Sequence, residues 1–189
     1  LANLGGIVVT VPHKESAAAL CDALTPAAQL IGAVNAVRLQ NGCLTGGNFD
    51  GLGFVAGLRS QGHDPADRHV YLAGLGGAGK AIACAIADAG PASLSLYNRS
   101  AAKAEAFAER LARHYPALAL HIAGPRPESC DIAINATSLG LADTDSLPFQ
   151  LDALAPGTVV ADAVMSRVDT PQLDCQAKCS GGVKCDFKA

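Results

Sequence analysis

The sequence predicts an α/β fold built on a parallel sheet, and two neighbouring patterns indicate it. Residues 70–73 form a short apolar run that stops at a glycine cluster, as a buried parallel strand does when it ends in a tight turn. Residues 80–89 follow as an alanine-rich segment of high helix propensity, which Gly90 and Pro91 terminate. Strand, glycine turn and helix in this order are typical of a Rossmann-type dinucleotide-binding domain.

The glycines between this strand and helix have the GxGxxG spacing of a phosphate-binding loop. Gly74 permits the sharp turn, and Gly76 lets the backbone approach a pyrophosphate. Gly79 lets the helix pack closely on the strand, and the helix N-terminus supplies amide donors for the anion. The alternative is a glycine-rich turn that only changes the direction of the chain, but the flanking strand and helix favour the phosphate-binding loop.

The end of the second predicted strand, residues 94–97, indicates which dinucleotide binds. An acidic residue at this point would favour NAD, because it accepts a hydrogen bond from the ribose 2′-hydroxyl. None is present. Instead, Asn98 can bond the ribose or the adenine, and Arg99 with Lys103 offers positive charge for a 2′-phosphate. The pattern favours NADP over the alternative, which is two solvated cations at the start of a helix.

The composition excludes several classes of protein. At 189 residues the chain can bury one core or two small ones, and its net charge of −3 argues against a nucleic-acid partner. The apolar runs are too short to span a membrane, and the first residues lack the basic region of a signal peptide. We therefore expect a cytoplasmic protein with neither a membrane nor a nucleic-acid partner.

The seven cysteines indicate reduced thiols rather than disulfides, because their number is odd and they are scattered through the chain. Three of them gather near the end, at Cys175, Cys179 and Cys185. No CxxC pair or nearby histidine completes a tetrahedral zinc site, so we expect no metal.

The segment before the phosphate-binding loop predicts a smaller α/β unit. A β-branched run at residues 7–11 predicts a buried strand, after which Lys14 lies where α/β proteins place ligand chemistry. For Lys14 alone, a solvated position at a helix start is the better interpretation. Asn35 interrupts an apolar strand, so it is either a structural bracket or a ligand contact. Further strands are expected at residues 32–39 and 43–47, joined by an Asn-Gly hairpin turn, and helices at 17–24, 27–31 and 52–61.

The segment after the second strand predicts the rest of the parallel sheet. Ser100 is expected to cap a helix that runs to Tyr115, where Pro116 stops it. Beyond Pro171 the chain has no apolar periodicity. Strands are expected at residues 118–122, 130–135 and 157–164, and a polar loop follows the second of these at residues 136–140.

Motifs along most of the chain resemble the shikimate/quinate dehydrogenases. They are VTVPHKE (9–15), GAVNAV (32–37), GGNFDGLGF (46–54), GLGGAGKA (74–81), YNRS (97–100), NATSLG (135–140) and DAVMSRVDTP (162–171). The resemblance implies an oxidoreductase of the shikimate pathway, which leads to chorismate and the aromatic amino acids. It would transfer a hydride between NADP and a small cyclic hydroxy acid, shikimate or quinate, as a monomer or homodimer.

The resemblance also implies roles for individual residues. Lys14 and Asp50 match the catalytic pair, and Thr10 and Asn35 match substrate-binding positions. The residues that match NADP contacts are those of the phosphate-binding loop, Gly74, Gly76, Gly77, Ala78 and Gly79, together with Asn98, Arg99, Ser100, Thr137 and Ser138.

The resemblance divides the chain into three parts. Residues 1–62 are expected to be part of a substrate-binding domain, residues 63–173 the NADP-binding domain, and residues 174–189 a tail unlike the family. Family segments that carry further substrate ligands at both ends have no match, and the chain begins with Leu1, so we expect a piece of a longer enzyme. The alternative is a catalytically impaired NADP-binding module.

Overall fold

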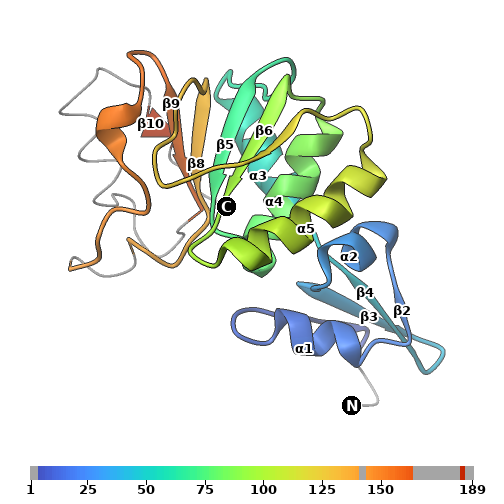
Figure 1. Cartoon of the computed structure of the whole chain (residues 1–189). Helices are drawn as coiled ribbons and strands as arrows, with labels where there is room; N and C mark the ends of the chain where they lie inside the picture. Colours follow the sequence, from blue (N-terminus) through green and yellow to red (C-terminus); the bar gives the residue numbers. More distant parts are fainter. Residues whose placement is uncertain (1–3, 141–143, 164–183, 186–189) are drawn as a thin grey trace.

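Two sheets organise the structure. The computed structural model describes residues 4–140, 144–163 and 184–185. A four-stranded sheet lies in the N-terminal segment and a six-stranded sheet in the remainder of the chain. Figure 1 shows the small sheet with its helices in blue, and the large sheet with further helices beside it.

The large sheet is parallel throughout and has the strand order β10-β9-β8-β5-β6-β7. This is the order of a doubly wound Rossmann sheet, whose direction of winding changes between β5 and β8. The sequence-based prediction of a Rossmann-type fold is therefore confirmed. The strands are β5 (His69–Ala73), β6 (Ser93–Tyr97), β7 (Leu120–Ile122), β8 (Ile132–Asn135), β9 (Val159–Asp162) and β10 (Lys184–Cys185).

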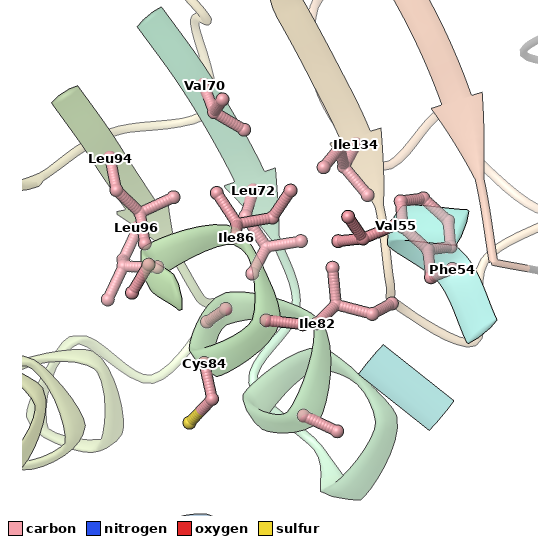
Figure 2. Packing of buried hydrophobic residues seen from close by; sticks show 14 of the residues in the cluster. Phe54, Val55, Val70, Leu72, Ile82, Cys84, Ile86, Leu94, Leu96 and Ile134 are labelled. Carbon is pink, nitrogen blue, oxygen red and sulfur yellow. The ribbon is translucent and has the colours of Figure 1, made fainter. Parts of the chain in front are cut away.

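Three helices cover one face of the large sheet: α3 (Asp50–Ser60), α4 (Gly77–Asp88) and α5 (Ala101–His114). Alternate strand residues such as Val70 and Leu72 point to this face, where Figure 2 shows them against Ile82 and Ile86 of α4. The opposite face is covered by Phe149 and the short helix η1 (Leu151–Ala153). The central strands β5, β8 and β9 are thus buried on both faces, which explains their mostly apolar sequences.

Helices α3 and α4 approach at backbone distance. A Cβ atom built at Gly51 would overlap the carbonyl group of Ala81 and would lie 3.0 Å from the Cβ of Ala85. Only glycine at this position lets the first turn of α3 touch α4.

The small sheet has the order β1-β3-β4-β2 and is mixed. The predicted hairpin is confirmed, with Asn41 and Gly42 both at positive φ in its two-residue turn. The predicted short helix is confirmed as well, and the Thr25 side chain caps it by accepting from the Ala28 amide at 3.2 Å. The elements are β1 (Gly6–Val8), α1 (Lys14–Ala19), β2 (Ala23–Leu24), α2 (Pro26–Ile31), β3 (Ala36–Gln40) and β4 (Cys43–Gly47).

Three predictions for the N-terminal segment were wrong. The strand expected at residues 7–11 is not buried, because β1 ends at Val8 and lies at the edge of the small sheet, where Val8 is 88% exposed. The helix expected at residues 17–24 ends at Ala19, because Ala23 and Leu24 instead form β2 and pair with β4. The helix expected at residues 52–61 begins earlier, at Asp50, and ends at Ser60.

Some predictions concern residues outside the described part of the chain. They are the end of the last strand at Val164, the whole of the segment 164–173 assigned to the NADP domain, and the cysteines Cys175 and Cys179 of the tail. Within the tail the structure describes β10 alone, a strand that the sequence did not predict. Among the described helices, none combines the length and apolar composition of a membrane span.

Candidate active site

Lys14 and Asp50 form an ion pair although 36 residues separate them. The Lys14 Nζ atom donates to Oδ2 of Asp50 at 2.6 Å. Lys14 is the first residue of α1 and Asp50 the first of α3, so two helix starts converge on this point. The two side chains are 13% and 25% exposed, which leaves the pair open to a small molecule.

A network of amides fixes the Asp50 carboxylate. Asn35 donates from Nδ2 to Oδ1 of Asp50 at 2.7 Å, and its own Oδ1 accepts from the Phe49 amide at 3.0 Å. Asn48 accepts from the Asp50 amide at 3.1 Å and donates to the Ala33 carbonyl at 3.2 Å. Sequence reasoning missed Asn48, although asparagine side chains commonly bond the backbone amide two residues on, as Asn48 does here.

The ion pair lies beside the phosphate-binding loop. A Cβ atom built at Gly77 would lie 3.5 Å from Cδ of Lys14 and 3.6 Å from Cβ of Ala33. The aliphatic stem of Lys14 therefore packs against the first residue of α4. The loop and the pair thus share one site.

The loop glycines have the geometry that a dinucleotide requires. Gly74 has a φ of +97°, and a Cβ there would lie 2.7 Å from the Thr137 nitrogen. A Cβ at Gly79 would overlap the Gly74 carbonyl oxygen, so α4 packs directly on the end of β5. Around Gly76 no atom lies within 4 Å of a built Cβ, which leaves space for a pyrophosphate beside the backbone.

Asn98 braces the phosphate-binding loop from the end of β6. Its Oδ1 accepts from the Leu75 amide at 3.2 Å, and its Nδ2 donates to the Ser100 carbonyl at 3.0 Å. Arg99 and Lys103 are exposed at the start of α5. Ser100 occupies the N-cap position, but its hydroxyl accepts no hydrogen bond from the helix, so the predicted side-chain cap was wrong.

The loop after β8 is ordered by a buried asparagine, Asn135. Its Oδ1 accepts from the amide and the hydroxyl of Thr137, at 2.9 and 2.7 Å. Its Nδ2 donates to the Leu139 carbonyl at 3.0 Å and to Oδ1 of Asp162 at 3.1 Å. Ser138 remains exposed in this loop. Sequence reasoning placed Asn135 at a strand end but assigned it no role.

The structure brings the predicted site residues together to different degrees. Hydrogen bonds join Lys14, Asp50 and Asn35, and the loops after β5, β6 and β8 meet at the carboxyl edge of the large sheet. Thr10 is exposed in the turn before α1, where its carbonyl accepts from the His13 amide at 2.9 Å. A separate groove of about 550 Å³ between α3 and α4 contains none of these residues.

No metal-binding arrangement accompanies this site in the part of the chain that the structure describes. The described histidine, cysteine, aspartate and glutamate side chains form no group of three or more that could hold an ion. The side chains that hydrogen bonds join at the site supply an ammonium, a carboxylate and an amide.

Known proteins match this chain closely. The family model described as "Shikimate dehydrogenase substrate binding domain" matches residues 1–37. The NADP(+) shikimate dehydrogenase of Rhodospirillum rubrum is 41% identical over 182 residues, covering 90% of this chain and 63% of the relative. The corresponding enzyme of Bacillus cereus strain 03BB102 is 39% identical over 185 residues, covering 96% of this chain and 66% of the relative.

Solved structures also match this chain over most of its length. A 5-ketofructose reductase from Gluconobacter sp. strain CHM43 is 33% identical with a TM-score of 0.81, covering 97% of this chain and 68% of that chain. Shikimate 5-dehydrogenase from Listeria monocytogenes, in complex with shikimate and NAD, is 29% identical with a TM-score of 0.83. The match covers 96% of this chain and 68% of that chain. The chain spans 63–66% of the length of the two curated relatives above. With these matches added to its sequence motifs and fold, the chain belongs to the shikimate/quinate dehydrogenase family.

Proposed function

We propose that this chain carries the proton-transfer pair and the cofactor-binding half of an NADP-dependent oxidoreductase that interconverts 3-dehydroshikimate and shikimate. The observation that carries the proposal is the Lys14–Asp50 ion pair of 2.6 Å, packed against the phosphate-binding loop at Gly77. Oxidation of a secondary alcohol releases a hydride and a proton, so a base must lie next to the cofactor site.

Lys14 is the proposed acid and base. In the neutral form its amine takes the proton of the substrate hydroxyl, and as an ammonium it returns a proton to the carbonyl oxygen in the reverse direction. Asp50 accepts a hydrogen bond from Lys14 and orients its Nζ atom, while Asn35 prevents the carboxylate from turning. Thr10 and Asn35 are proposed to bind the polar groups of the substrate, as their family counterparts do.

NADP, when bound, supplies the nicotinamide that accepts or donates the hydride. The free space at Gly76 and the glycine contacts of α4 fit its pyrophosphate. Arg99 and Lys103 are proposed to hold the 2′-phosphate, since both are exposed beside the loop that Asn98 braces. Ser100, Thr137 and Ser138 complete the proposed NADP site.

The domain assignment is also a proposal. The small sheet lies within residues 6–47 and the large sheet begins at His69, which supports a substrate-binding part at 1–62 and an NADP-binding part at 63–173. Helix α3 joins the two, because its buried residues belong to the core of the large sheet while Asp50 at its start belongs to the catalytic pair. We further propose a cytoplasmic monomer or homodimer that acts on shikimate or on a quinate-type acid.

Turnover and cofactor binding test the proposal separately. The purified chain is assayed for NADPH oxidation with 3-dehydroshikimate and with 5-ketofructose, and for NADP reduction with shikimate and with quinate. Because the chain spans 63–66% of those relatives, the assays are repeated on a chimera that adds the unmatched segments of one of them. We expect turnover by the chimera with shikimate and 3-dehydroshikimate, and its reduction by about 10²–10⁴ in Lys14→Ala. Inactivity of both proteins with every substrate would refute the assignment.

The alternative, an NADP-binding module without catalysis, makes a different prediction. In that case NADPH raises the melting temperature of the chain and of the chimera, whereas shikimate shifts neither temperature and neither protein turns over.

A further inference from the structure

Two consecutive residues of α1 make ion pairs in different directions. Lys14 reaches Asp50 at 2.6 Å, and Glu15 accepts from Nζ of Lys80 at 2.9 Å. Lys80 lies in the first turn of α4, 65 residues further along the chain. The Glu15–Lys80 pair therefore joins the helix that begins with the proposed base to the helix that begins at the phosphate-binding loop.

In the described structure, the charges that act on the Glu15 carboxyl are positive ones, those of Lys80 and Lys103. The hydrogen bond from Lys80, followed by the charge of Lys80 and then that of Lys103, lowers the pKa of the Glu15 carboxyl. Glu15 is 61% exposed and Lys80 21% exposed, so water screens the pair and its contribution to global stability is small. Its effect is geometric and concerns how α1 lies on α4.

Helix α1 packs on the small sheet through Ala17 and Ala18, whereas the side chains that it places against α4 are those of Lys14 and Glu15. It is six residues long, and its Lys14 carbonyl accepts from the Val34 amide at 2.9 Å, a bond within the N-terminal segment. The contact of Lys14 with Gly77 involves the aliphatic stem, which can slide over a glycine without losing a hydrogen bond. A charged hydrogen bond on the neighbouring residue gives this contact a fixed register.

We propose that Glu15 and Lys80 are positioning residues, and that their ion pair sets the distance between the Lys14 ammonium and the phosphate-binding loop. This inference rests on the proposed function for its catalytic consequence, but the structural contact is independent of it. A displacement of 1 Å can cost roughly a hundredfold in rate. The pair therefore acts on turnover through Lys14, without touching substrate itself.

A charge-swap cycle tests the inference without any assay of activity. Glu15→Lys, Lys80→Glu and the double variant are compared with the parent by amide hydrogen exchange at Ala17, Leu20 and Cys21, which are bonded within or just beyond α1. We expect each single variant to exchange about two- to five-fold faster in α1, as loss of one partly exposed ion pair allows. The swapped pair should restore exchange to within about twofold of the parent.

A matched control is the Arg59–Asp64 pair, with a distance of 3.1 Å and exposures of 49% and 53%. Arg59→Glu should leave exchange in α1 unchanged, since this pair lies at the other end of α3. In the active chimera, Glu15→Lys and Lys80→Glu should lower kcat about three- to ten-fold, a part of the loss that a full 1 Å shift causes, and the swap should recover it. KM for 3-dehydroshikimate should change less than kcat.

The outcomes separate the two proposals. Unchanged exchange in α1 for both single variants, or failure of the swap to restore it, overturns the inference whatever the enzyme does. Normal kcat in single variants whose α1 exchanges faster also overturns it, because the contact would then not position Lys14. If the parent chimera never turns over while exchange responds as expected, the proposed function fails and the structural link from α1 to α4 is retained.

Discussion

Asn35 holds the oxygen of Asp50 that Lys14 does not contact, so both carboxylate oxygens are engaged, at 2.7 and 2.6 Å. The carboxylate has no free rotation about its Cβ–Cγ bond without losing one of these bonds. The orientation of Nζ is thus determined by side chains from three separate segments: the start of α1, the residue before β3 and the start of α3.

The first prediction concerns Lys14 and Asp50 as a unit. In the active chimera, Lys14→Ala should lower kcat by about 10²–10⁴, the usual range for a positioned acid or base, and leave NADPH affinity intact. Asp50→Asn should also lower kcat, and the double variant should cost less than the product of the two effects. Steady-state kinetics with NADPH titrations measure all three. If the loss of kcat in the double variant equals the product of the two single losses, Lys14 and Asp50 act independently.

The second prediction concerns cofactor choice. Arg99→Asp should weaken binding of NADP strongly and of NAD little, because it replaces a cation beside the proposed 2′-phosphate with a like charge. Arg113→Asp is the control, since it makes the same charge change at the far end of α5. Calorimetric titration of both dinucleotides gives the ratio of dissociation constants. An equal loss for NAD and NADP in Arg99→Asp would mean that the residue is structural.

The third prediction concerns stability and pH. Because Lys80 holds the pKa of Glu15 below its ordinary value of 4.5, the folded state binds fewer protons there than the unfolded state. The stabilisation is complete above the ordinary pKa and is lost as the pH falls through the lowered one. Urea unfolding should show the parent more stable than Glu15→Gln at about pH 6, by about 0.2–1 kcal/mol, the range for exposed pairs. The difference should shrink towards about pH 3, and a gap that grows on acidification would contradict the assignment.

The fourth prediction concerns thiol reactivity. Burial, as the largest cause, raises the pKa of Cys84 on α4 to about 12, whereas Cys43 is exposed at the hairpin. At about pH 8 a thiol-specific reagent should therefore label Cys43 at least 10²-fold faster than Cys84, as the small thiolate fraction and the buried position require. Peptide mass mapping over time measures both rates. Comparable rates would show that α4 opens readily from the sheet.

Local patterns predicted the large sheet apart from β10, because the other elements each have a signal within their own residues. The apolar runs, the glycine spacing and Pro116 are all visible over a few positions, and the structure confirms the elements they indicate. The small sheet was harder. The run 7–11 has the same β-branched composition as a buried strand, but its burial depends on what lies beside it, and here β1 is an edge strand.

The site was predictable only in part for the same physical reason. No local rule relates Lys14 to Asp50, and their roles came from the family resemblance. The side-chain amides of Asn35 and Asn48 donate hydrogen bonds to residues distant in the sequence, and Glu15 pairs with the distant Lys80. The spacing of these residues carries no periodic signal. The hydrogen bond that the Asn98 side chain accepts from the Leu75 amide could not be predicted from the sequence either, because an asparagine can donate and accept in many ways.

The contact of Gly51 with Ala81 limits how freely the two halves of such an enzyme can be recombined. Asp50 is carried by a helix whose next residue touches the backbone of α4, so the site depends on the surface of that one cofactor-half helix. A chimera that joins residues 1–62 to the cofactor half of another dehydrogenase would need a small residue where Ala85 stands, because the Ala85 Cβ lies against Gly51. A larger side chain there would push α3 outward and draw the Asp50 carboxylate away from Lys14, so exchange of halves between relatives depends on this helix-to-helix contact.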